Sequence, residues 1–186
     1  YRQNARDLPW RENPEPYQVW VSEIMLNQTR VEAVKPYYRR FLEALPDAAA
    51  LANAPEEQLM KLWEGLGYYS RARNLQKAAR QIMERHGGKL PPSYELLLDL
   101  AAFGEYTAGA VASIAFGIPV PAVDGNVLRV FSRVLASDSD IMAPAVRKGC
   151  RRLLLETMPQ NCPGDYNQAL MELGATLCAP NGPSNC

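Results

Sequence analysis

Residues 100–110 read Leu100-Ala-Ala-Phe-Gly-Glu-Tyr-Thr-Ala-Gly-Ala and give the clearest indication of the architecture. An apolar helix ends in this stretch, and a second helix of small residues opens at Thr107. We expect Gly104 to form a tight hairpin between them, because glycine adopts turn conformations that other residues disfavour. The second helix then presents backbone N–H groups outward, and such a nest binds a phosphate without side-chain charge. An ordinary connection between two helices fits the same residues.

On both sides of this hairpin the pattern is helical almost throughout, and strand-like alternation is scarce. We therefore expect an all-α protein of about ten helices, separated by proline and glycine. Gly87 is expected to end one helix, and Ser93 and Asp124 to cap two others. The expected helices run from Tyr17 to Leu45 with a break near Pro36, from Pro55 to Glu64, from Arg71 to His86, from Tyr94 to Leu100, from Thr107 to Phe116, from Val127 to Leu135, and near residues 146–158 and 164–177.

The composition is that of a globular protein with a sizeable core. Of the 186 residues, 47% are hydrophobic and 22% are charged, which excludes a disordered tail or a fibre. No apolar run approaches the roughly 20 residues that a membrane span needs, so we expect a soluble protein without membrane contact. The chain opens at Tyr1 rather than at a methionine and shows no targeting leader, so we expect a fragment of a longer protein.

The net charge of zero does not indicate a nucleic-acid partner, and the cysteine content indicates a reducing environment. The chain has 20 basic and 20 acidic residues, whereas a nucleic-acid-binding domain is usually basic. The four cysteines are few and late in a chain that can fold without disulfides, so we expect a reducing, intracellular environment. Two local basic clusters suit either a solvated helix face or a nucleic acid: Arg71, Arg73, Lys77 and Arg80 form the first, and Arg147, Lys148, Arg151 and Arg152 form the second.

Glu23 is the first candidate for chemistry. On a helix its same-face neighbours are Val19, Trp20, Leu26 and Asn27, most of which are apolar. A carboxyl group in such surroundings is poorly solvated, which raises its pKa and suits it to donate a proton near neutral pH. A surface glutamate whose carboxylate reaches solvent beside Trp20 fits the same spacing.

Two loops carry further candidates. Asp124 opens Asp-Gly-Asn-Val, which suits a turn and a helix N-cap. The same position also suits a catalytic role, because the N-terminus of a helix keeps an aspartate ionised, and the carboxylate can then face a developing cation. Residues 65–74 place Tyr68 and Tyr69 on a glycine-rich loop beside Arg71. Aromatic rings at such a loop tip suit wedging into a base stack, and packing of both rings into the core is the alternative.

Taken together, five segments in order resemble the MutY adenine DNA glycosylases of the helix-hairpin-helix glycosylase superfamily. The resemblance implies two helical lobes with DNA in the cleft between them: a six-helix barrel with the hairpin over residues 16–119, and a second lobe from residues 1–15 and 120–186. The segments are Asp-Leu-Pro-Trp-Arg (7–11), Trp-Val-Ser-Glu-Ile-Met-Leu-Asn-Gln-Thr (20–29), Trp-Glu-Gly-Leu-Gly-Tyr-Tyr-Ser-Arg-Ala-Arg-Asn-Leu (63–75), Val-Asp-Gly-Asn-Val (123–127) and Tyr-Asn-Gln-Ala-Leu-Met-Glu-Leu-Gly-Ala (166–175).

The resemblance also implies a reaction. Such an enzyme removes adenine mispaired with 8-oxoguanine in double-stranded DNA, by hydrolysis of the N-glycosidic bond in base-excision repair. The adenine must be flipped out of the stack before it is reached. We expect a monomer that acts where the genome is, in the nucleus, the mitochondrion or a bacterial cytoplasm.

Single residues acquire roles from the same resemblance. Glu23 matches the general acid that protonates the adenine ring and later activates water, and Asp124 matches the carboxylate that stabilises or traps the oxocarbenium sugar. Tyr106 and Asn126 match residues that support these two groups, and Tyr106 replaces the Schiff-base lysine of strand-cleaving relatives, which indicates a monofunctional enzyme. The adenine pocket is matched by Trp10, Arg11, Leu26, Thr29 and Gln168, the opposing oxidised guanine by Gln28 and Tyr68, and the phosphate-binding hairpin by Ala102, Gly104, Tyr106 and Thr107.

The sequence departs from the family pattern at several points. The family hairpin usually reads Leu-Pro-Gly-Val-Gly, and a positive φ at Ala102 would strain this one by about 1–2 kcal/mol. Asn27 stands where the family usually has glutamine. The family's 4Fe-4S cluster needs four cysteines. Cys178 matches the first, Cys186 lies one residue late for the second, and the other two are missing, as is the family's C-terminal domain.

Two other functions stay open. A catalytically silent helix-hairpin-helix module that binds DNA or senses lesions fits the altered hairpin and the incomplete cysteine set. A glycosylase for another base, such as a damaged pyrimidine, fits the fold, but Tyr106 and Gln168 speak against it. The retained pair of Glu23 and Asp124 favours the adenine glycosylase.

Overall fold

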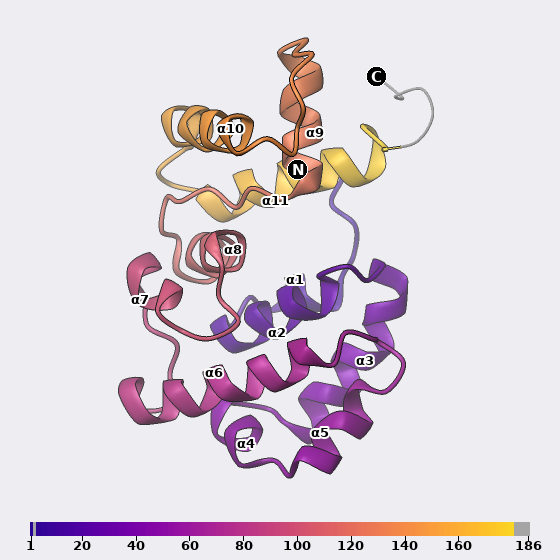
Figure 1. The fold of residues 1–186 in the computed structure, drawn as a ribbon, viewed down its shortest axis with the longest axis vertical. Helices are drawn as coiled ribbons and strands as arrows, with labels where there is room; N and C mark the ends of the chain where they lie inside the picture. Colours follow the sequence, from indigo (N-terminus) through magenta and orange to yellow (C-terminus); the bar gives the residue numbers. More distant parts are fainter. Residues whose placement is uncertain (2, 181–186) are drawn as a thin grey trace.

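The computed structural model describes residues 1 and 3–180, and within these residues the regular secondary structure is helical (Figure 1). The predicted all-α class is therefore confirmed. None of the described helices is long and apolar enough to cross a membrane. The helices are α1 (Pro9–Glu12), α2 (Pro16–Leu26), α3 (Val31–Ala44), α4 (Ala48–Asn53), α5 (Glu56–Trp63), α6 (Ser70–His86), α7 (Tyr94–Leu98), α8 (Glu105–Phe116), α9 (Gly125–Val134), α10 (Pro144–Thr157) and α11 (Pro163–Thr176).

Several helix ends lie where the capping residues predict them. Gly87 ends α6 in the left-handed region, with φ of 59°. The Ser93 hydroxyl accepts a hydrogen bond from the Leu96 N–H at 3.3 Å at the start of α7, and Asp124 Oδ1 accepts one from the Val127 N–H at 2.8 Å at the start of α9. These side chains satisfy N–H groups that have no partner within the helix.

The break expected near Pro36 is wrong. Helix α3 runs through Pro36, and the chain breaks earlier, at residues 27–30 between α2 and α3. Gln28 lies there with φ of 61°, which is incompatible with a continuing helix. A proline inside a helix removes one backbone hydrogen bond, and the packing of α3 against α2 and α5 offsets that loss.

Two hydrophobic clusters hold the helices together. The larger is built from α1 to α8, around the fully buried Trp20, Phe41 and Trp63, and the smaller joins α9 and α10 through residues such as Val127 and Leu154. Helix α8 contacts both α2 and α11, and it lies between α9–α11 at the top of Figure 1 and α2–α6 below. The division of the chain into lobes at residues 119 and 120 stays a prediction.

Helix α8 is approached closely by two backbone segments. A Cβ atom at Gly109 would lie 2.3 Å from the carbonyl oxygen of Pro121, and one at Gly164 would lie 2.7 Å from that of Ser113. Asn167 of α11 is fully buried and donates through Nδ2 to Ser113 Oγ at 2.8 Å. Gly109 thus lets the segment after α8 dock directly on α8, and Gly164 does the same for helix α11.

Candidate active site

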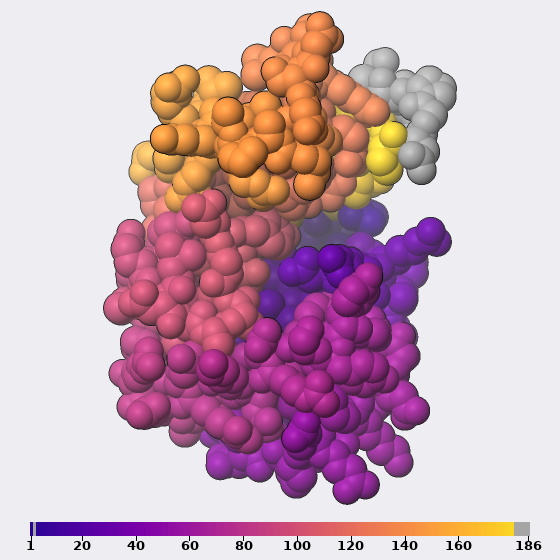
Figure 2. Space-filling model, in the orientation of Figure 1, coloured from indigo at the N-terminus to yellow at the C-terminus, as the bar shows by residue number. Residues whose placement is uncertain are grey.

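A cavity of about 1230 Å³ opens between α2 and α8 on one side and α11 and the start of α9 on the other. Figure 2 shows the surface hollowed between the orange and purple parts of the chain, with N-terminal residues inside the hollow. Most of the residues predicted for catalysis, base binding and phosphate binding line this cavity: Trp10, Arg11, Glu23, Leu26, Gln28, Thr29, Ala102, Gly104, Tyr106, Thr107, Asp124, Asn126 and Gln168.

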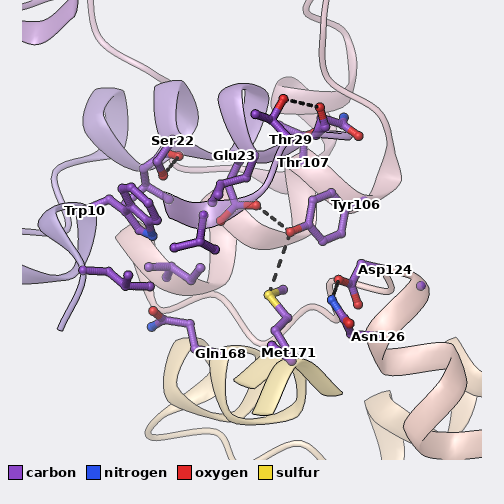
Figure 3. A pocket seen from close by; sticks show the side chains of 18 of the residues that line it. Trp10, Ser22, Glu23, Thr29, Tyr106, Thr107, Asp124, Asn126, Gln168 and Met171 are labelled. Atoms are coloured by element: carbon purple, nitrogen blue, oxygen red, sulfur yellow. Dashed lines mark hydrogen bonds between the residues drawn. The ribbon is translucent and has the colours of Figure 1, made fainter. Parts of the chain in front are cut away.

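Glu23 is the buried acid of the cavity, with only 6% of its surface exposed. Tyr106 donates a hydrogen bond from Oη to Glu23 Oε2 at 2.5 Å (Figure 3). The pKa of Glu23 is raised to about 7, mainly by burial and also by the nearby charge of Asp124, although the Tyr106 hydrogen bond and the charge of Arg11 lower it in part. Both protonation states of Glu23 are therefore populated near neutral pH, and the alternative of a solvated surface glutamate is wrong.

Tyr106 acts as a permanent hydrogen-bond donor at this site. Its burial, followed by the charge of Glu23, raises its pKa well above the usual value of 10.0, so that Oη keeps its proton. The same oxygen lies 3.8 Å from the sulfur of Met171 on α11. Tyr106 therefore orients the carboxyl group of Glu23, and the weakly polar sulfur of Met171 is the other neighbour of its hydroxyl oxygen.

Asp124 faces the same cavity from the start of α9 (Figure 3). Asn126 donates from Nδ2 to Asp124 Oδ2 at 2.8 Å, and the Val127 N–H holds Oδ1 at the same distance. The predicted cap is thus confirmed, and it holds the half-buried carboxylate at the cavity wall. Because both oxygens are anchored, the carboxylate has a defined orientation before any ligand arrives.

Asn126 is in turn fixed by two neighbours. Arg129 Nη2 donates to Asn126 Oδ1 at 2.8 Å and to the carbonyl oxygen of Gly174 at 2.7 Å. A Cβ atom at Gly174 would lie 2.5 Å from the Cβ atom of Asn126, so α11 and the start of α9 touch without space for a side chain. The position of Asp124 therefore depends on the packing of α9 against α11.

Glu172 is a cavity residue that the sequence analysis did not single out. It is buried on α11, one helical turn after Gln168, and its carboxylate accepts from Arg6 Nε at 2.7 Å and from Arg11 Nη2 at 2.9 Å. Burial alone raises the pKa of Glu172, but the hydrogen bonds from Arg6 and Arg11 outweigh it and lower the pKa to about 2. Glu172 thus ties the N-terminal segment to α11 and sets where Arg11 stands in the cavity.

The hairpin has the strain that its altered sequence predicts. Ala102 has φ of 63°, a conformation that costs about 1–2 kcal/mol in a residue with a Cβ atom. Trp20 of α2 stacks on Phe103 with ring centroids 5.3 Å apart, which anchors the hairpin to α2. Gly104 is then the N-cap of α8, so the first N–H groups of α8 lie at the cavity rim.

Gln28 and Tyr68 lie at the tips of two exposed loops. Tyr68 is 62% exposed and Tyr69 is 39% exposed, so the alternative that both rings pack into the core is wrong. Gln28 lines the cavity, whereas Tyr68 is outside the set of lining residues. Both residues have a positive φ, 61° at Gln28 and 47° at Tyr68.

The cysteines within the described part of the chain do not form a cluster site. Cys178 is buried and its sulfur accepts from Arg133 Nη1 at 3.2 Å, whereas Cys186 lies outside the described residues. Burial raises the pKa of Cys150 to about 11, as expected for an inert thiol. Among residues 1 and 3–180, no three His, Cys, Asp or Glu side chains come together to hold a metal, so the donors described do not fit a 4Fe-4S cluster.

Comparison with known proteins identifies the family of the chain. The family described as "HhH-GPD superfamily base excision DNA repair protein" matches residues 21–155. The chain belongs to this superfamily. The HhH-GPD match extends from α2 through the hairpin and the Asp124 cap into α10.

The resemblance to MutY-type adenine glycosylases is also confirmed. The adenine DNA glycosylases of Mus musculus and Homo sapiens are each 46% identical to this chain, over 197 and 192 residues. These matches cover 100% and 98% of the chain but 38% and 35% of the relatives, so the chain spans less than half the length of the relatives it matches.

Solved structures confirm the predicted helix-hairpin-helix glycosylase fold. A thermostable thymine-DNA glycosylase is similar with a TM-score of 0.88 and 30% identity, covering 98% of this chain and 84% of that one. A non-covalent endonuclease III–DNA complex is similar with a TM-score of 0.79 and 24% identity, covering 91% of this chain and 78% of that one.

Proposed function

We propose that this HhH-GPD chain removes adenine from double-stranded DNA by hydrolysis of the N-glycosidic bond, and that its substrate adenine is paired with 8-oxoguanine. One observation carries the proposal: Glu23 is a buried acid with a pKa of about 7, on the wall of a cavity that also holds the anchored carboxylate of Asp124. A proton donor and a separate carboxylate on one cavity are what breaking a sugar–base bond requires.

In the proposed reaction Glu23 acts as the general acid. Its protonated carboxyl group donates a proton to a ring nitrogen of a flipped adenine, and the electron pair of the breaking C1′–N bond moves onto the base. The base then leaves as neutral adenine. Tyr106 keeps the carboxyl group in place through its hydrogen bond to Oε2. The ionised Glu23 afterwards accepts a proton from the water that adds to the sugar.

Asp124 is proposed to face the positive charge that develops at the sugar. Its carboxylate is held by Asn126 and by the N-terminus of α9, so it needs no reorganisation as the charge appears. In this role it either stabilises the oxocarbenium ion or traps it covalently, as in retaining glycosidases.

The remaining cavity residues supply a place for the base and for the DNA backbone. Trp10 is buried against Tyr38 with ring centroids 5.4 Å apart and offers an apolar wall, while the amide of Gln168 offers both a donor and an acceptor for a purine edge. The N–H groups after Gly104 suit a DNA phosphate. Because Tyr106 occupies the position of the Schiff-base lysine, we expect an intact abasic strand as the product.

The test is single-turnover adenine release from a duplex with one 8-oxoguanine:adenine pair. We expect release by the wild-type protein, none above background by Glu23→Gln, and release slowed by at least about a hundredfold by Asp124→Asn. The exposed Glu57→Gln variant on α5 is the matched control for the loss of a carboxylate, and circular dichroism verifies that each variant is folded.

Two outcomes would replace the proposal. A folded wild-type protein that binds the duplex but releases no base would be a silent DNA-binding module. Release of thymine from a guanine:thymine duplex, with adenine untouched, would instead match the activity named for the structurally similar thymine-DNA glycosylase. Equal release from 8-oxoguanine:adenine and guanine:adenine duplexes would refute the proposed preference for the oxidised pair.

A further inference from the structure

Arg71 occupies a position that its own helix does not explain. It lies in the first turn of α6, where the helix dipole disfavours a cation. It is also half-buried, whereas Arg73 and Arg80 of the same basic cluster are exposed. The prediction of a solvated helix face therefore fails at Arg71, and the reason for its placement must lie in what its guanidinium contacts.

The guanidinium of Arg71 joins two loops that are far apart in the sequence. Its Nη1 group donates to carbonyl oxygens at and after the end of α2, and its Nη2 group donates to carbonyl oxygens in the turn before α6 and to the Thr29 hydroxyl at 3.2 Å. The carbonyl acceptors are Ile24 at 3.0 Å, Met25 at 3.0 Å and Asn27 for Nη1, and Leu66 at 3.0 Å and Gly67 at 3.2 Å for Nη2.

Two of these acceptors directly precede the strained residues. The Asn27 carbonyl belongs to the peptide unit before Gln28, and the Gly67 carbonyl belongs to the peptide unit before Tyr68. Gln28 and Tyr68 are non-glycine residues in the left-handed region, with φ of 61° and 47°. Such conformations persist only where the surroundings determine them.

We propose that Arg71 is a positioning residue that holds Gln28 and Tyr68 in their left-handed conformations and thereby presents both side chains to DNA as one rigid unit. This inference rests on the proposed function, in which the cavity rim meets a DNA duplex. The Cζ atom of Arg71 also lies 5.6 Å from the centre of the Tyr68 ring, so the same guanidinium contacts the backbone and the side chain of this loop.

The fork of arginine suits this task and lysine does not. A guanidinium has five N–H donors fixed in one plane and reaches two loops at once, whereas an ammonium group is a single point with three donors. Two loops ordered before binding lose less conformational freedom when they meet DNA. Arg71→Lys therefore keeps the positive charge and removes the planar fork of donors that connects the two loops.

The first test is amide hydrogen exchange of the free protein, read by mass spectrometry. In Arg71→Lys we expect exchange about tenfold faster in residues 24–30 and 64–70, the effect of losing roughly one charge-assisted hydrogen bond, and unchanged exchange in residues 72–86. Arg73→Lys, an exposed neighbour paired with Glu56, is the matched control. Unchanged exchange in either loop, or faster exchange along all of α6, would overturn the inference.

The second test is a mutant cycle on the affinity for the 8-oxoguanine:adenine duplex. Arg71→Lys is expected to weaken binding about tenfold in the wild-type background and not at all when Gln28 and Tyr68 are both alanine. Independent losses that add would refute the proposal. Neither test requires base release, so a protein that binds but does not excise would refute the proposed function and leave this inference standing.

Discussion

Replacing Glu23 with glutamine is expected to make the protein more stable at pH 8 and inactive at every pH. Glu23 is buried, and its pKa is raised from 4.5 to about 7 in the folded protein. Folding therefore binds a proton between pH 4.5 and 7, and stability falls as the pH rises through this interval. At about 1.4 kcal/mol per pH unit, the folded protein loses about 3 kcal/mol by pH 8.

Glutamine has nearly the same shape as protonated glutamic acid and still accepts the hydrogen bond from Tyr106. It has no charge to bury, so Glu23→Gln avoids the loss of stability that the wild-type protein suffers as the pH rises from 4.5 to 7. We expect the free energy of unfolding of the variant to exceed that of the wild type by up to about 3 kcal/mol at pH 8, and to equal it near pH 4.

The measurement is urea unfolding of both proteins at several pH values between 4 and 8, with Glu57→Gln as the control at an exposed carboxylate. The control removes an exposed carboxylate from the first turn of α5, where the helix dipole favours a negative charge, so it is expected to gain no stability over the wild type as the pH rises. Parallel curves for the wild type and Glu23→Gln, or a variant that is less stable at pH 8, would refute the claim that Glu23 is desolvated enough to work as an acid.

Three further changes test other parts of the site. Ala102→Gly relieves the left-handed strain of the hairpin and is expected to raise the free energy of unfolding by about 0.5–1 kcal/mol, measured by urea unfolding. Gly174→Ala drives a Cβ atom into Asn126, so we expect it to lower the free energy of unfolding by about 1–3 kcal/mol and to slow adenine release. Gly149 has open space around it, so Gly149→Ala is expected to raise the free energy of unfolding by about 0.5–1 kcal/mol. Tyr106→Phe removes a hydrogen bond that lowers the pKa of the neighbouring acid, so the pH at which single-turnover release declines is expected to rise.

The local features of the fold could be predicted from the sequence because they depend on residues a few positions apart. Caps at Ser93 and Asp124 and the end of α6 at Gly87 are examples. The apolar neighbours of Glu23 on its own helix fitted a buried acid with a raised pKa, as the structure shows, but their spacing alone also fitted a solvated surface glutamate. The helices α1 and α4 were not predicted, since elements of 4 and 6 residues are too short to show a helical period. Helix α7 has only 5 residues, and it was predicted from its Ser93 cap.

The features that escaped prediction depend on contacts between distant parts of the chain. Glu172 meets Arg6 and Arg11 across separations of 166 and 161 residues, and nothing in the sequence around it marks a buried ion pair. The break after α2 was expected at Pro36, because proline is the local signal. The break occurs at residues 27–30. There Arg71, more than 40 positions later in the sequence, donates hydrogen bonds to the carbonyl groups at the end of α2.

The distribution of strain in the described residues supports the same site on independent grounds. The non-glycine residues with positive φ are Gln28, Tyr68, Ala102 and Ala136, and all but Ala136 lie in the loops and hairpin that the proposed function turns toward DNA. A buried acid with a raised pKa lies in the cavity that Gln28 and Ala102 line. Each of these features lowers stability, and each is removable by one substitution that leaves the hydrophobic clusters intact. Unfavourable local conformations at one cavity, and in the loop that Arg71 joins to its rim, are expected where a protein sacrifices stability for function, because packing alone would select against every one of them.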